Sequence, residues 1–232
     1  MKHLLSFWRD FIDLLFPRVC LACAGELVES EELVCTGCWA TIPKTQSHVQ
    51  ALPALHAKFV GRVAVKHVFS YLSFEKSSRV QSLLHELKYR NQTELGILLG
   101  KFYGTDLRQI RFQDQLDLIL SVPLHQKKHK QRGYNQSDLF AEGLSAALGV
   151  PWSGVALQRA TYTTTQTNKN RAERWQNVSG VFVVPNAADV AGKRVALVDD
   201  VMTTGATIES AVVTLLNAGC REVSVITIAA VM

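Results

Sequence analysis

The most informative residues for chemistry are two adjacent carboxylates, Asp199 and Asp200, which directly follow the apolar run 195–198. A run that is apolar at every position is typical of a central parallel strand covered by helices on both faces. Ligands bind at the carboxyl ends of such strands, where two acids can accept hydrogen bonds from the vicinal hydroxyls of a ribose. The alternative is an ordinary buried strand with an acidic cap. It is disfavoured because two acids placed there without a ligand would repel each other.

A threonine-rich loop follows the acid pair and leads into a helical pattern that is expected to begin at about Thr207. Gly205 allows the backbone to curl with its amides inward, and a helix N-terminus attracts anions. Hydroxyl groups add donors of the kind that a phosphate needs. We therefore expect a ribose 5-phosphate site in which the phosphate is bound by Thr203, Thr204, Gly205, Ala206 and Thr207.

Near the amino terminus, two C-x-x-C pairs are separated by eleven residues and consist of Cys20, Cys23, Cys35 and Cys38. Two such pairs can surround a tetrahedral metal with four thiolates, so the spacing predicts a structural Zn²⁺ site. Four protein ligands leave no open position for catalysis, and the metal would serve to fold a segment too small for its own core. A redox dithiol and disulfides are the less favoured alternatives.

Two segments concentrate positive charge. The first follows an expected strand at 117–122 and contains Lys127, Lys128, Lys130 and Arg132. The second is the long polar connection 158–182, which contains Lys169, Arg171 and Arg174. A connection of this length inside a compact domain is usually functional or mobile. We expect both segments to approach an anionic ligand, and a solvated surface loop is the alternative for the first.

Alternating strand and helix patterns must position these residues. Strands are expected at 63–74, 117–122, 155–157, 180–184, 194–198 and 223–228, and helices at 78–89, 93–107, 135–148 and 208–216. This alternation predicts an α/β domain with a parallel sheet flanked by helices over residues 58–232. Residues 1–50 are expected to form a small separate unit that contains the cysteine motif. The polar stretch from Pro43 to about Ala57 is expected to be a linker.

The chain has 232 residues, of which 47% are hydrophobic and 19% charged, and this suits one sizeable globular domain with a small appendage. Residues 1–50 carry four Lys or Arg against six Asp or Glu. The net charge of +5 therefore comes from the larger domain, which suits anionic partners.

The first sixteen residues place apolar side chains at helical spacing, but Arg9, Asp10 and Asp13 interrupt the run. This density of charge argues against a signal peptide or a membrane span. The protein is therefore expected to be cytoplasmic and not an integral membrane protein. An amphipathic helix is expected here, packed on the rest of the protein, with membrane-surface or partner docking as the alternative.

Residues 199–207 resemble the phosphoribosyl pyrophosphate (PRPP) loop of type I phosphoribosyltransferases, in which two acids and two variable residues precede T-T-G-x-T. Over nearly the whole chain, the order of motifs also resembles the ComF family, which is linked to natural competence. The positions that carry this second resemblance are the cysteine quartet, Lys88, Tyr89, Pro123, residues 132–136, Gln166, Arg174, Asn177 and residues 199–207.

The resemblance implies a type I phosphoribosyltransferase-like fold with an N-terminal zinc finger, and binding of PRPP together with Mg²⁺. It implies that Asp199 and Asp200 are the catalytic residues and contact the ribose hydroxyls. The two basic segments would hold the departing pyrophosphate. It further implies a role in handling imported single-stranded DNA, with single-stranded DNA and other competence proteins as partners.

Two positions depart from related patterns. Residues 168–170 are Asn-Lys-Asn in place of the family's usual Gly-Leu-Ser, and this affects how the long loop closes. Thr203 stands where purine-salvage enzymes often carry an aspartate base, which disfavours hypoxanthine and guanine as substrates. We therefore expect a PRPP-binding phosphoribosyltransferase that acts in DNA uptake. The alternatives are a non-catalytic nucleic-acid-associated protein that uses PRPP only as a regulatory ligand, and a nucleotide-salvage phosphoribosyltransferase.

Overall fold

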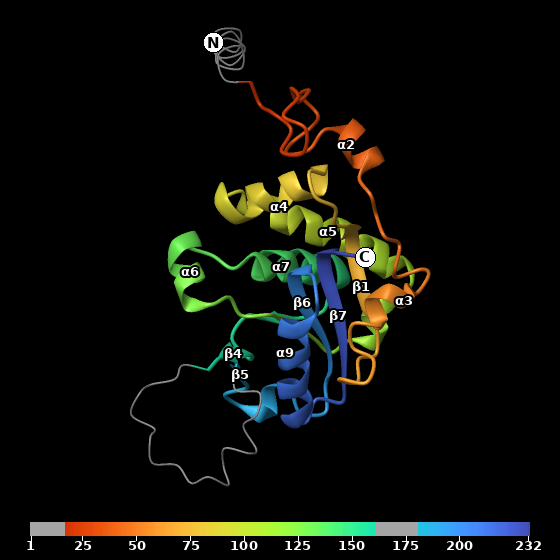
Figure 1. Ribbon diagram of the computed structural model, residues 1–232, viewed down its shortest axis with the longest axis vertical. Coiled ribbons are helices and arrows are strands. Elements are labelled where there is room, and N and C mark those ends of the chain that lie inside the picture. Colours follow the sequence, from red (N-terminus) through yellow and green to blue (C-terminus); the bar gives the residue numbers. More distant parts are fainter. Residues whose placement is uncertain (1–16, 161–180) are drawn as a thin grey trace.

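A five-stranded parallel sheet forms the centre of the larger domain (Figure 1). The computed structural model describes residues 17–160 and 181–232. The strands lie in the order β1-β7-β6-β2-β3, so β6 has a neighbour on each side. Their bounds are β1 Val68–Ser73, β2 Leu118–Ser121, β3 Trp152–Ser153, β6 Arg194–Met202 and β7 Glu222–Ala230. The predicted parallel sheet of an α/β domain is confirmed.

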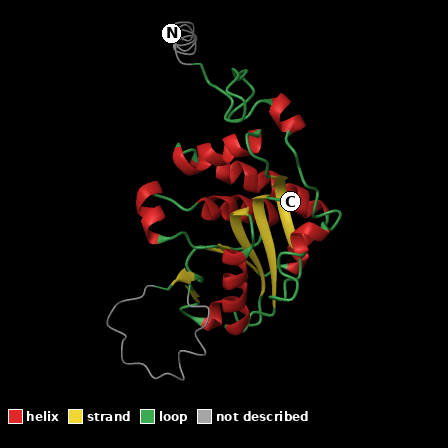
Figure 2. Cartoon of the chain, viewed as in Figure 1, coloured by secondary structure: helices red, strands yellow, loops and turns green. Residues whose placement is uncertain are grey.

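Helices cover both faces of this sheet (Figure 2). One face packs against α4 Arg79–Tyr89, α5 Thr93–Gln109 and α7 Gln136–Leu148, and the other against α3 Pro53–His56 and α9 Ala206–Asn217. Side chains of a strand alternate between faces. In β6, Ala196 and Val198 accordingly belong to the first core and Val195 and Leu197 to the second. The uninterrupted apolar run therefore follows from burial on both faces.

The helices α5 and α7 approach each other unusually closely, because glycines face each other where they cross. A Cβ atom built on Gly100 would lie 2.3 Å from the carbonyl oxygen of Phe140, and one on Gly143 would lie 2.2 Å from the carbonyl oxygen of Ile97. Real Cβ atoms do not make such contacts. The close packing fixes the position of α7, whose first residues face the candidate site described below.

Some expected strands are shorter or lie elsewhere. β1 begins at Val68 and not at residue 63, and residues 155–157 do not form a strand. Short strands flank them instead, namely β3 and β4 Gln158–Arg159. β4 pairs in antiparallel fashion with β5 Phe182–Val183 in a separate two-stranded ribbon. The remaining short elements are η1 Phe112–Gln115 and η2 Ala187–Asp189.

The stretch that was expected to be a linker packs against the sheet. Lys44 forms a β-bridge with Leu72 of β1. The buried hydroxyl of Ser47 accepts a hydrogen bond from the backbone N–H of Ser70 and donates one to its carbonyl oxygen. Leu55 of α3 is fully buried in the core beneath α9. Buried polar groups need such partners, and backbone groups of β1 provide them here.

The cysteine-containing unit is small and contains α2 Thr36–Thr41 and a β-bridge between Val19 and Glu26. It contacts α5, where the rings of Trp39 and Phe102 lie 4.8 Å apart in an edge-to-face arrangement. The expected N-terminal helix lies in residues 1–16, outside the described part of the chain. In the described part, every helix is too short or too polar to cross a bilayer.

Candidate functional site

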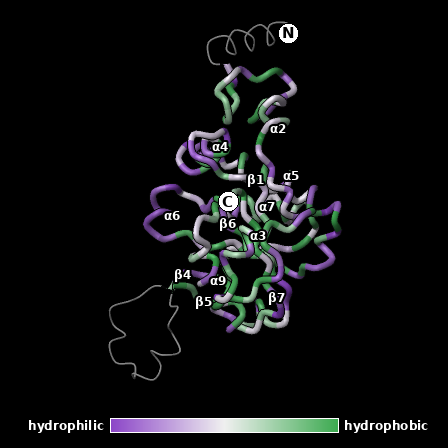
Figure 3. The backbone as a smooth tube through the Cα atoms, turned by 45° about the vertical axis from the view of Figure 1, so that its right-hand side comes forward, coloured by the Kyte–Doolittle hydropathy of each residue, from purple (hydrophilic) through white to green (hydrophobic). Residues whose placement is uncertain are grey.

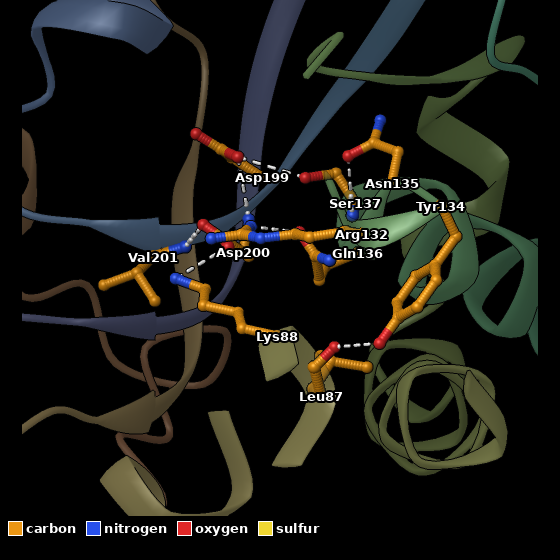
Figure 4. Close-up of polar contacts among 10 residues, drawn as sticks. All are labelled: Leu87, Lys88, Arg132, Tyr134, Asn135, Gln136, Ser137, Asp199, Asp200 and Val201. Atoms are coloured by element: carbon orange, nitrogen blue, oxygen red, sulfur yellow. Dashed lines mark hydrogen bonds and ion pairs between the residues drawn. The ribbon is translucent and has the colours of Figure 1, made fainter. Parts of the chain in front are cut away.

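The two carboxylates of the expected site lie inside β6, because the strand continues to Met202 rather than ending at Val198. Asp199 is still in register with Thr227 of β7. The pair nonetheless lies near the carboxyl end of the central strand, as expected from the sequence. Figure 4 shows both carboxylates facing groups from α4 and α7.

Asp199 is held by hydrogen bonds on its own strand and on α7. Its Oδ1 atom accepts a hydrogen bond from the hydroxyl of Ser137 (3.1 Å) and another from the backbone N–H of Asp200 (2.8 Å). Burial raises the pKa of Asp199 above its ordinary range, and the neighbouring charge of Asp200 raises it further. Lys88 opposes this shift. A cation or a hydroxyl-bearing ligand would favour the charged form.

Asp200 forms an ion pair with Lys88, which is on the last turn of α4. The distance from Lys88 Nζ to Asp200 Oδ2 is 2.8 Å, and the side chains are only 22% and 18% exposed. The other oxygen, Oδ1, accepts a hydrogen bond of 2.6 Å from the backbone N–H of Val201. Because water screens this pair only partly, the ammonium group fixes the orientation of the carboxylate.

Gly205 begins the helix that follows the loop, and its conformation requires a glycine. Its φ is 82°, in the left-handed region, and a Cβ atom there would lie 3.3 Å from the ring of Phe59. α9 starts at Ala206, one residue earlier than predicted. Thr203 and Thr204 are exposed on the turn before it. The loop thus has the glycine-containing turn and the helix N-terminus that a phosphate site needs.

A cavity of about 190 Å³ connects the acid pair to the basic segment and to Thr207 of this loop, whereas residues 203–206 lie outside its lining. Its polar lining includes both acids, Thr207 and four cations: Lys88, Lys128, Arg132 and Arg159. The basic segment is not a loop, because residues Gln126–Arg132 form the helix α6, which has no buried residue. Figure 3 shows that this helix is strongly hydrophilic.

The structure brings some of the predicted cations to the cavity and not others. Lys128 and Arg132 line it, whereas Lys127 is exposed on α6 outside the lining. Three further predicted cations lie in residues 161–180, outside the described part of the chain: Lys169, Arg171 and Arg174.

Sequence reasoning gave no site role to several residues that line the cavity, namely Lys88, Gln136, Ser137 and Arg159. Lys88 and Gln136 were noticed only as part of a family pattern. Arg159 lies at the start of the long polar connection, donates a hydrogen bond from Nε to the carbonyl of Pro123 (2.9 Å) and stacks over Phe182. The available signal was its position within the polar connection 158–182, which was already expected to be functional or mobile.

The four thiols near the amino terminus form a compact cluster. Their sulfur atoms all lie within 4.8 Å of one another, and those of Cys23 and Cys35 are 3.9 Å apart. Zinc–sulfur bonds of about 2.3 Å place neighbouring thiolates about 3.8 Å apart in a tetrahedron. The backbone N–H of Cys35 also donates to Cys20 Sγ (3.3 Å), which stabilises a thiolate. The cluster therefore fits a structural zinc ion.

Two family models match separate parts of the chain. Residues 136–232 match the family model of the phosphoribosyl transferase domain, and residues 11–49 match that of the double zinc ribbon domain. The chain is 30% identical over 223 residues to the DNA utilization protein YhgH of Escherichia coli O157:H7, covering 91% of this chain and 96% of that protein. It belongs to the ComF family.

Two other relatives have names that refer to competence. The chain is 28% identical to competence protein F of Haemophilus influenzae, over 89% of this chain and 94% of that one. It is 23% identical to competence protein ComFC of Bacillus subtilis, over 87% and 90%. The ComF chain therefore combines a phosphoribosyltransferase-like domain with a zinc ribbon, as predicted.

Proposed function

We propose that this protein binds PRPP together with Mg²⁺ in the cavity at the carboxyl end of β6. The observation that carries the proposal is the arrangement of Asp199 and Asp200 beside a glycine-initiated helix, in a cavity whose other charged side chains are basic. A ribose with vicinal hydroxyls and anionic groups at both ends matches this lining. The ribose would contact the acids, and its 5-phosphate the loop 203–207.

The charge of the cavity supports a ligand that is both anionic and rich in hydroxyls. Four cations and two carboxylates line it, so a net positive charge remains after Lys88 neutralises Asp200. Carboxylate oxygens are also ligands that Mg²⁺ prefers, and the acid pair could contact the ion directly or through water. Mg²⁺ would neutralise part of the diphosphate charge.

The reaction supported by this geometry is displacement of pyrophosphate from C1 of the ribose. A nucleophile forms a bond to C1 while the bond from C1 to the pyrophosphate oxygen breaks, and the pyrophosphate leaves with the electron pair. The protein would position the ribose through Asp199 and Asp200 and stabilise the negative charge of the leaving group through Lys128 and Arg132. The names of the relatives support a role of this activity in the uptake or use of DNA.

A second candidate function is binding of PRPP as a regulatory ligand without transfer. Thr203, at the position where salvage enzymes often carry a base, is exposed and outside the cavity lining. A threonine hydroxyl is a poor proton acceptor at neutral pH. Measurement of pyrophosphate release from PRPP and Mg²⁺ in the presence of single-stranded DNA separates the two functions, since only transfer releases pyrophosphate.

Calorimetric titration with PRPP and Mg²⁺ tests the binding itself. Loss of a charged hydrogen-bonding group costs about 1.5–3 kcal/mol, so Asp200→Asn should weaken binding about tenfold to a hundredfold. Gly205→Val should weaken it further, because a β-branched residue is strained at this φ and would meet the Phe59 ring. Asp189→Asn, in η2 and outside the cavity lining, is the matched control.

Circular dichroism must first show that each variant is folded. Comparison of Lys88→Met with the double variant Lys88→Met and Asp200→Asn shows how much of the Asp200 effect remains when no ammonium group is left unpaired. The proposal is contradicted if the wild type does not bind PRPP at millimolar concentration. It is also contradicted if the folded Asp200→Asn and Gly205→Val variants bind PRPP as tightly as the wild type.

A further inference from the structure

The amide side chain of Gln136, the first residue of α7, has an unused hydrogen-bond donor in the wall of the cavity. Gln136 is fully buried and lines the cavity. Its Oε1 atom accepts a hydrogen bond of 2.7 Å from an Nη atom of Arg132. Its Nε2 atom is buried and has no hydrogen-bond partner in the described part of the chain, although the Gln136 side chain does interact with that of Tyr134. Figure 4 shows Gln136 and Arg132 beside Lys88 and Asp200.

The orientation of this amide is fixed by chemistry. A guanidinium group has only donors, so the amide oxygen of Gln136 must face Arg132 and the NH₂ group must point the other way. A buried donor without an acceptor destabilises the fold, because it has lost its hydrogen bonds to water. A buried glutamine is therefore retained here at a cost to stability that a ligand with an acceptor oxygen would remove.

The surroundings of Gln136 are already ordered and positively charged. The guanidinium of Arg132 lies 5.2 Å from the centre of the Tyr89 ring, which holds it in place from α4. The hydroxyl of Tyr134 donates a hydrogen bond of 2.6 Å to the carbonyl of Leu87, which ties the segment between α6 and α7 to α4. Lys88 follows Leu87 directly and reaches the same cavity. An acceptor oxygen that enters this corner would meet two cations.

We propose that Gln136 is a specificity-determining residue that donates a hydrogen bond from Nε2 to a phosphoryl oxygen of the pyrophosphate group. The inference rests on the proposed PRPP site and deepens it. Gln136 and Arg132 act on the pyrophosphate end of the ligand, whereas Thr207 and its loop act on the 5-phosphate end. Gln136 therefore contributes to affinity for pyrophosphate and not to affinity for ribose 5-phosphate.

The decisive variant is Gln136→Glu. A glutamate is nearly the same size and can still accept the hydrogen bond from Arg132, but it replaces the NH₂ donor with a carboxylate oxygen. Calorimetry with Mg²⁺-pyrophosphate and, separately, with ribose 5-phosphate should show that affinity for pyrophosphate falls about tenfold or more. Affinity for ribose 5-phosphate should stay within about twofold of the wild-type value, well below the tenfold step that one such hydrogen bond is worth.

Two comparisons control for structure and charge. Gln136→Met removes the hydrogen bond with Arg132 and the proposed one to pyrophosphate, but it adds no charge. It should therefore weaken pyrophosphate binding less than Gln136→Glu. Gln126→Glu adds the same charge at an exposed position of α6 outside the cavity lining and should leave both affinities unchanged. Circular dichroism verifies that each variant is folded.

The outcomes separate this inference from the proposed function. If the wild type binds both ligands and folded Gln136→Glu binds pyrophosphate as tightly, the role of Gln136 is wrong and the PRPP site stands. Equal losses for both ligands also overturn the inference, because they indicate a general structural role. If the wild type binds neither ligand nor PRPP, both proposals fail.

Discussion

Replacement of Asp199 by asparagine should make the protein more stable at neutral and alkaline pH. The pKa of Asp199 is raised by burial and by the charge of Asp200, although Lys88 and Arg159 carry compensating charge nearby. The folded state therefore holds the proton more tightly than the unfolded state does. Stability is then lost as the pH rises from the ordinary aspartate range, near 4, through the raised pKa. Asparagine removes this penalty and keeps an oxygen that can accept from Ser137.

The size of the effect follows from the linkage between proton binding and folding. Within that pH window the free energy of unfolding falls by about 1.4 kcal/mol per pH unit for one such group. For a chain of this length, 1 kcal/mol corresponds to a shift in Tm of about 2–4 °C. Each unit by which the pKa of Asp199 is raised should therefore give Asp199→Asn a Tm higher by about 3–6 °C at pH 8. The difference from the wild type should shrink as the pH is lowered toward 5.

Thermal unfolding of both proteins, followed by circular dichroism between pH 5 and 8.5 without ligand, measures this difference. Asp117→Asn is a control of opposite sign, because hydrogen bonds from Arg194 lower the pKa of Asp117 to about 2. That variant should be less stable than the wild type over the whole range. If Asp199→Asn has a lower Tm at pH 8, or the same gain at pH 5 and pH 8, the charge of Asp199 is not the source of the cost.

Two further predictions concern the zinc ribbon and DNA. Protein purified without chelator should contain about one zinc per chain. The double variant Cys35→Ser with Cys38→Ser should lose this zinc. The site is contradicted if elemental analysis finds no zinc in the wild type or unchanged zinc in the variant. Single-stranded DNA should bind through the exposed cations of α6. Replacement of Lys127, Lys128 and Lys130 by alanine should reduce the slope of log affinity against log salt concentration by up to about 2. The control is alanine at Lys66 and Lys193. These residues precede β1 and β6 and therefore lie at the amino-terminal ends of the strands, opposite the end that α6 follows. Loss of binding on deletion of residues 1–50, with normal binding by the folded triple variant, would mean that the ribbon and not α6 holds the DNA.

The sequence predicted the central features of the site because they depend on local patterns. An uninterrupted apolar run followed by two acids predicts a central strand, and β6 confirms the strand, although it continues past the acids to Met202. Gly205 was expected to form a turn, and its positive φ agrees. The cysteine spacing likewise predicted the cluster that the folded chain forms.

What the sequence did not predict depends on contacts between distant segments. Lys88 and Asp200 are far apart in the chain, and only the packing of α4 against the sheet brings them within 2.8 Å. The buried amide of Gln136 looks like an ordinary polar residue at a helix start. The stretch 44–57 has the composition of a linker, yet the buried hydroxyl of Ser47 exchanges hydrogen bonds with the backbone of Ser70 in β1, which no local pattern reveals.

The glycine contact between α5 and α7 extends the requirements of the cavity to residues that touch no ligand. α5 contacts the zinc ribbon through Phe102, and α7 begins with Gln136 and Ser137 in the cavity lining. Since any side chain at Gly100 or Gly143 would meet backbone atoms, even a methyl group there must push the helices apart and displace the start of α7. In a survey of tolerated substitutions, Gly100 and Gly143 would therefore accept as few replacements as residues of an active site do. Their intolerance would reflect the spacing between two helices and not any chemistry of their own.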